Sequence, residues 1–180
     1  MFWRLFALAC ILGSAGAGAS RVVDDPAECP GVCDRSIAYT IDAGFDADQR
    51  SLIEQAMRVW ERGTGERVCF SPGGRDLVFE KIDRAEQLAP WDPDWAQHIA
   101  LTKGGHVWIV GTSVSEPGEF RALAVHEIGH HLGLGHVEDT PMTYMHSSIN
   151  DTPEPLRMVG RLPERDRRDY CAAQRCTCAL

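Results

Sequence analysis

Three histidines with a distinctive spacing carry the chemistry that this sequence suggests first. Residues 126–136 read His-Glu-Ile-Gly-His-His-Leu-Gly-Leu-Gly-His. His126 and His130 are four residues apart, so on a helix their imidazoles project from one face and can meet the same metal ion. Gly133 allows the backbone to leave the helix, with a positive φ, and to bring His136 round as a third ligand. Three nitrogen ligands leave a tetrahedral zinc ion with one open position, which a catalytic zinc site requires.

Glu127 directly follows the first of these histidines. Its carboxylate can reach a water molecule in the open position, take a proton from it and pass that proton to a leaving amine. A zinc ion lowers the pKa of such a water from about 15.7 to about 7. The histidines could instead be core residues with no metal. Five fixed positions, namely three His, one Glu and one Gly, argue against that interpretation.

The other histidines do not join this pattern. His131 follows His130 directly, so its side chain points about 100° away on a helix, and we expect it to be a surface or packing residue. His98 and His106 have no ligand spacing that supports a second, structural metal ion. We therefore expect one catalytic Zn²⁺, without support for additional Ca²⁺ or structural Zn²⁺.

Alternating strand patterns and two helical patterns must position these residues. A strand is predicted at 36–41, and further strands at 67–70, 77–80 and 107–110. One amphipathic helix runs from a cap at Asp46 or Asp48 to about Arg62, and a second runs from about Pro117 to Leu132. Residues 84–98 are predicted to form a long loop, residues 138–163 to be irregular, and residues 163–173 to form a last helix. The class is α+β.

The first 19 residues are typical of a secretory signal. Arg4 supplies the positive charge, residues 5–12 form a short apolar run, and small residues precede Ser20, the expected first residue of the mature chain. Residues 20–180 are then the expected catalytic domain. No segment is long enough to span a bilayer. We expect a secreted, extracellular protein; a periplasmic location, or a lipid anchor at Cys10, is less favoured.

Charge and cysteine content fit an exported protein that does not bind nucleic acid. The formal net charge is −8, and phosphate binding would need clustered Lys and Arg. Beyond Cys10 there are six cysteines, an even number that predicts disulfides in an exported chain. They are Cys29, Cys33, Cys69, Cys171, Cys176 and Cys178. Their pairing stays open, and their placement allows a bridge between the C-terminal tail and the body. A metal site at the last three is less favoured.

The run at 126–136 resembles the metzincin zinc signature, H-E-x-x-H-x-x-G-x-x-H, and its Leu-Gly-Leu-Gly-His ending is most similar to the matrixin branch. The resemblance implies a zincin fold with a twisted mixed sheet, two long helices and a small irregular C-terminal part with one helix. It also implies a zinc metalloendopeptidase, here of the bacterial type without a long pro-segment, that acts as a monomer on proteins or peptides.

Metzincins also have a methionine turn beneath the metal. Met145 matches the family pattern best, and Met142 is the alternative. Tyr144 is expected to pack, although it could also approach the reacting oxygen. The segment 147–157 corresponds to the wall of the substrate pocket, and a peptide is expected to extend along an edge strand, which we place at 107–110 or its neighbour.

Two other function classes stay open from the sequence. A binding module with a structural zinc would have no use for Glu127 and would close the fourth ligand position. A zinc hydrolase acting on another substrate, such as a cell-wall peptide, would carry the same signature.

Overall fold

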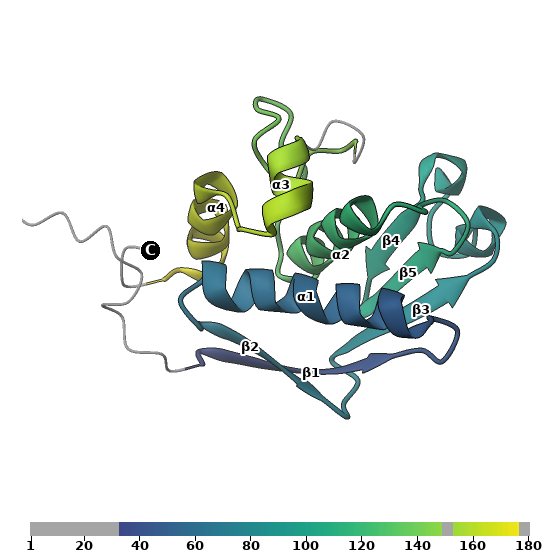
Figure 1. Cartoon of the computed structure of the whole chain (residues 1–180), viewed down its shortest axis with the longest axis horizontal. Coiled ribbons are helices and arrows are strands. Elements are labelled where there is room, and N and C mark those ends of the chain that lie inside the picture. The colour runs from purple at the N-terminus through teal and green to yellow at the C-terminus, as the bar shows by residue number, and fades with distance from the viewer. Residues whose placement is uncertain (1–32, 149–152, 177–180) are drawn as a thin grey trace, which may run out of the picture.

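A five-stranded mixed sheet forms one layer of the molecule (Figure 1). The computed structural model describes residues 33–148 and 153–176. The strands are β1 (Arg35–Ile41), β2 (Val68–Pro72), β3 (Leu77–Ile82), β4 (Ala100–Lys103) and β5 (His106–Val110), in the order β2-β1-β3-β5-β4. All neighbours pair in parallel except β4, which is antiparallel to β5. The predicted α+β class with a mixed sheet is confirmed.

Two long helices cover one face of this sheet (Figure 1). Helix α1 (Ala47–Gly63) begins at Asp46, whose carboxylate accepts from the Gln49 amide at 2.8 Å, while the Gln49 side chain accepts from the Asp46 amide. This capping box satisfies two backbone donors that the first turn leaves without partners. Helix α2 (Pro117–His131) has its proline in the first turn, as expected.

The C-terminal part contains two helices, where one was predicted. Helix α4 (Glu164–Gln174) matches the prediction, but α3 (Glu154–Val159) lies within the segment predicted to be irregular. The prolines of this segment suggested a loop. However, Pro153 is the N-cap of α3 and Pro155 lies in its first turn, where a backbone amide would have no partner within the helix, so that the missing N–H of proline costs nothing. Gly160 ends α3 with a φ of 57°.

The edge of the sheet next to α2 is β4, a strand that the sequence analysis did not predict. Strand β5 lies inside the sheet, between β3 and β4, so its neighbour is the edge strand. Gly104 and Gly105 join β4 to β5 with φ values of 59° and 84°. Positive φ at both central residues is what a two-residue hairpin turn of type I′ needs, and Gly-Gly meets it without steric cost. The predicted loop before β4 contains two 3₁₀ turns, η2 (Ala85–Leu88) and η3 (Trp95–Gln97).

The main core lies between the sheet and the two long helices. Val107 and Ile109 of β5 face it, whereas Trp108 and Val110 face a smaller cluster on the other side of the sheet. This alternation follows the two-residue period of a strand. Trp60 of α1 is fully buried, and its Nε1 donates to a backbone carbonyl of α2, that of Val125, at 2.9 Å.

Two disulfides are formed among the described cysteines. Cys33 pairs with Cys69 and joins the start of the described chain to β2, while Cys171 pairs with Cys176 and closes the end of α4. Neither bridge joins the two ends of the chain. The signal segment 1–19, Cys29 and Cys178 lie outside the described residues. Among the helices that are described, none is both long and apolar enough to cross a membrane.

The burial of Trp60 gives a test of this packing. Trp60→Phe should lower the free energy of unfolding by roughly 2–4 kcal/mol, because it leaves a cavity and removes a buried donor. Urea denaturation measures the change. The matched control is Trp91→Phe at a residue that is 48% exposed, where we expect a change within about 1 kcal/mol. Equal losses for the two variants would contradict the proposed role of Trp60.

Candidate metal centre and cleft

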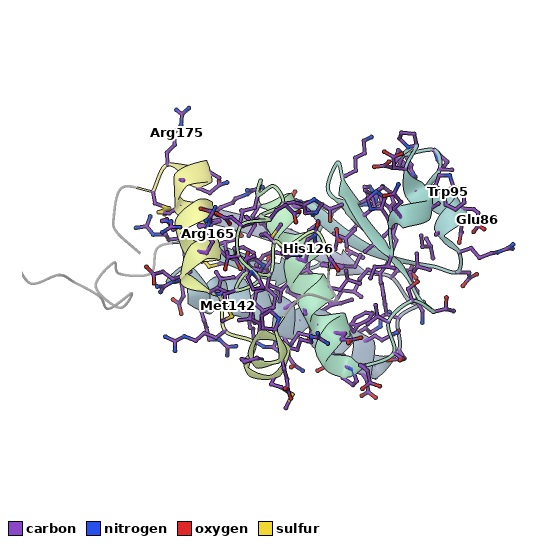
Figure 2. All side chains as sticks on the ribbon, turned by 90° about the horizontal axis from the view of Figure 1, so that it is seen from above. Glu86, Trp95, His126, Met142, Arg165 and Arg175 are labelled. Atoms are coloured by element: carbon purple, nitrogen blue, oxygen red, sulfur yellow. A yellow bond between two sulfur atoms is a disulfide. The ribbon has the colours of Figure 1, made fainter. Side chains whose placement is uncertain are left out.

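The three predicted histidines meet at one point near the centre of the molecule, where Figure 2 labels His126. The Nε2 atom of His130 lies 2.9 Å from that of His126 and 3.1 Å from that of His136. The first two histidines come from the last turns of α2. After them, Gly133 turns the chain with a φ of 93° and allows His136 to return to the same point.

Hydrogen bonds to backbone carbonyls set the orientation of two of these imidazoles. The Nδ1 atom of His126 lies 2.6 Å from the Tyr144 carbonyl oxygen, and that of His130 lies 2.9 Å from the Leu134 carbonyl oxygen. A carbonyl can only accept, so each Nδ1 carries the proton and each Nε2 presents its lone pair. Converging lone pairs repel one another unless a cation lies between them. The donor set therefore fits a zinc ion, which takes imidazole nitrogens at about 2.0–2.1 Å.

Burial keeps these ligands neutral. Burial, together with the nearby His130, lowers the pKa of His126 to about 3. Burial also lowers the pKa of His130. Because a metal binds only the neutral imidazole, both residues are ready to bind at neutral pH without losing a proton.

Glu127 lies in the same cleft as the histidines and is only 4% exposed. The Thr102 hydroxyl, on edge strand β4, donates to Glu127 Oε2 at 2.7 Å. Burial raises the pKa of this carboxyl to about 7, although the Thr102 hydrogen bond opposes the rise. A divalent cation held by the histidines would favour the carboxylate form.

The cleft has a volume of about 800 Å³ and lies between β4 and α2. Besides the histidines and Glu127 it is lined by Asp92, Gln97, His98, Ile99, Ala100, Leu101, Thr102, Leu123, Ser147 and Ser148. Part of the predicted pocket wall, residues 149–152, lies outside the described residues. The free edge of β4 thus borders a cleft large enough for several substrate side chains.

Met145 forms the floor below α2. It is fully buried, whereas the alternative, Met142, is 50% exposed. A Cβ at Gly129 would collide with Met145 Sδ, so the glycine permits this close contact. The Met145 carbonyl accepts from the Val137 amide at 2.8 Å, which ties the turn to the chain just after His136.

Asp166 of α4 holds this turn in place, a role that the sequence analysis did not assign to it. It lies in the first turn of α4, where an acidic side chain is favoured, and it is fully buried. Its carboxylate accepts from the Thr143 hydroxyl and, at 2.8 Å, from the Tyr144 amide. The Tyr144 carbonyl is the partner of His126, so α4 supports a predicted ligand through one intermediate residue. The Tyr144 hydroxyl donates to the Leu156 carbonyl at 2.6 Å, which supports packing.

The remaining histidines do not belong to this group of three, although His98 lines the same cleft. His131 has an Nε2 that is buried without a hydrogen bond among the described residues. The Nε2 atom of His98 lies 3.7 Å from Asp92 Oδ2, and the Nδ1 atom of His106 lies 3.4 Å from Glu80 Oε2. In the described ranges, the only group of three possible ligands is the one at His126, His130 and His136.

Comparisons with known proteins agree with this geometry. The sequence model of the matrixin family matches residues 92–169, which include β4, β5, α2 and the methionine turn. Over residues 92–169 this chain is similar to the matrixins, and it is a zinc metallopeptidase. The crystal structure of archaemetzincin from Methanopyrus kandleri is similar in fold, with a TM-score of 0.55 and 12% identity. The match covers 79% of the matrixin-like chain and 96% of the archaemetzincin chain. A comparison with curated protein sequences finds no match.

The buried Asp166 predicts how the stability of this matrixin-like peptidase depends on pH. Burial raises the pKa of Asp166 to about 6, so between about pH 4 and pH 6 the folded state holds a proton that the unfolded state has lost. Stability should therefore fall as the pH rises through that window, by roughly 1–3 kcal/mol relative to Asp166→Asn. Urea denaturation of both proteins at each pH measures the difference. A difference that does not change with pH would contradict the assignment.

Proposed function

We propose that this matrixin-like peptidase is a secreted zinc endopeptidase, with one zinc ion held by His126, His130 and His136 and with Glu127 as the general base. The observation that carries the proposal is the position of the Glu127 carboxylate. The Thr102 hydroxyl donates a hydrogen bond of 2.7 Å to Glu127 Oε2, in the same cleft as the three converging imidazoles. A buried carboxylate costs stability unless it is paired, and a divalent cation held by the histidines would provide that pairing.

Each residue has a separate part in the proposed reaction. Zinc, when bound, supplies a Lewis acid that acidifies water and polarises the scissile carbonyl. Glu127 accepts the proton of the attacking water and delivers it to the leaving amine. Thr102 orients that carboxylate through its hydroxyl. The exposed edge of β4 provides backbone donors and acceptors to which an extended peptide can add as a further strand.

The ligand count favours catalysis over a binding module with a structural zinc. Structural zinc sites have four protein ligands, whereas catalytic sites have three and leave a position for water. Within the described residues, the group at this centre has three members, and Glu127 is not one of them. The neighbouring carboxylate therefore remains available to act on water.

Glu127→Gln tests the general base. It should lower kcat for casein hydrolysis by about 10²–10⁴-fold, because the amide cannot accept the proton, while one zinc ion per chain is retained. Activity is measured on zinc-loaded protein with and without a chelator, and zinc by elemental analysis. The control is His131→Gln, a change at the adjacent histidine outside the ligand group, which should keep both zinc and turnover. Full activity of Glu127→Gln would overturn the assignment.

Export has its own test. We infer that residues 1–19 are removed and that the mature catalytic domain begins at Ser20, and the two disulfides support an oxidising location. When the full chain is expressed in a host with an export system, mass spectrometry of the protein from the medium should find Ser20 as the first residue. A protein that stays inside the cell and still begins with Met1 would contradict export.

A further inference from the structure

A second cavity lies at the C-terminal end of the molecule and shares no lining residue with the metal cleft. Its volume is about 560 Å³. Its lining includes Arg161, Arg165, Arg167 and Arg168, with Leu156 and Leu162 among its apolar residues. We call it the arginine pocket. In Figure 2, Arg165 and the lining residue Met142 lie at the same end of the molecule, opposite the end that carries Trp95.

The charge of this pocket is opposite to that of the chain. The chain has a formal net charge of −8, yet four arginines line one cavity together with a single acidic residue, Glu164. Gathering like charges in a concave site raises the local positive potential, because the low-dielectric walls focus the field. A potential of this sign favours the entry of an anion.

One of the four arginines is held in place, and three remain available. Arg165 is ion-paired through Nε with Asp169 at 2.6 Å and through Nη1 with Asp139 at 3.1 Å. In the part of the chain that the structure describes, no ion pair is formed by the side chains of Arg161, Arg167 or Arg168. Three guanidinium groups can therefore turn their donors toward a ligand.

Guanidinium geometry indicates which anion fits. Each group presents a planar fork of donors that matches two oxygens of a carboxylate or phosphate. A phosphate monoester carries a charge of about −1.5 to −2 and three acceptor oxygens, so it can engage more than one arginine at once, whereas a carboxylate carries one charge. Met142 is 50% exposed, so apolar surface lies next to the cations, whereas Leu156 and Leu162 are only 7% and 4% exposed and form the buried side of the pocket.

We propose that the arginine pocket binds the phosphate group of an organic phosphate ester. The ester could belong to a soluble molecule or to a lipid headgroup, since both present the same group to the arginines. The apolar lining would contact the organic part of the ligand. This proposal concerns the pocket alone and does not depend on peptidase activity.

Isothermal titration calorimetry of the zinc-loaded protein with glycerol 3-phosphate tests the pocket directly. We expect saturable binding with one site per chain. The double variant Arg167→Gln, Arg168→Gln should bind at least about tenfold more weakly, since two charge-assisted contacts with the phosphate would be lost. The matched control is Arg58→Gln, Arg62→Gln, which removes the same charge from two exposed arginines of α1 and should bind as the unchanged protein does. Thermal unfolding shows that each variant is folded.

Vesicle sedimentation separates the two sources of phosphate. If the natural ligand is a lipid headgroup that ends in a phosphate monoester, the protein should sediment with vesicles that contain phosphatidic acid, and this sedimentation should be lost when Arg167 and Arg168 are changed. If it is a soluble ester, calorimetry gives the same loss while the protein stays in the supernatant. The proposal is overturned if neither probe binds, or if the α1 control weakens binding as much as the pocket variant, which would indicate diffuse charge attraction.

Discussion

The active centre depends on the direction in which imidazole lone pairs point. Backbone carbonyls fix the protonated nitrogens of His126 and His130, and the opposite nitrogens then converge with that of His136. One carbonyl comes from the turn after α2 and the other from the methionine turn, so the metal geometry depends on loops as well as on the helix. Such outer hydrogen bonds orient ligands and raise their basicity, which makes them part of the metal site.

Packing around α2 keeps this arrangement rigid. Trp60 joins α1 to α2, and Gly129 allows Met145 to approach the helix from the other side. Gln174 of α4 donates to the Leu132 carbonyl at 2.8 Å, where α2 ends. A helix held on several sides cannot shift its histidines without disturbing the core, because close-packed interiors yield little. Thr102 extends the same constraint to the carboxylate from the sheet edge.

The sequence predicted most of what depends on local pattern. Helix periodicity and the capping residue gave α1 and α2, and the spacing at 126–136 gave the three histidines that converge. It did not predict β4, because the four residues Ala-Leu-Thr-Lys carry little strand signal. The Gly-Gly pair that follows them is a hairpin signal that was not used. Asp166 and Thr102 were missed for another reason. Their partners are 22 and 25 residues away in the chain, and only the folded structure brings each pair together.

The dependence of the methionine turn on Asp166 also bears on the order in which the site is completed during synthesis. All three histidines and Glu127 precede α4 in the chain, but the carboxylate that fixes the turn lies within it. A nascent chain that has emerged only as far as Gly160 therefore carries every residue of the proposed reaction without the support that orients His126. Because chains emerge from the N-terminus first, this support for His126 is completed only after α4 has left the ribosome.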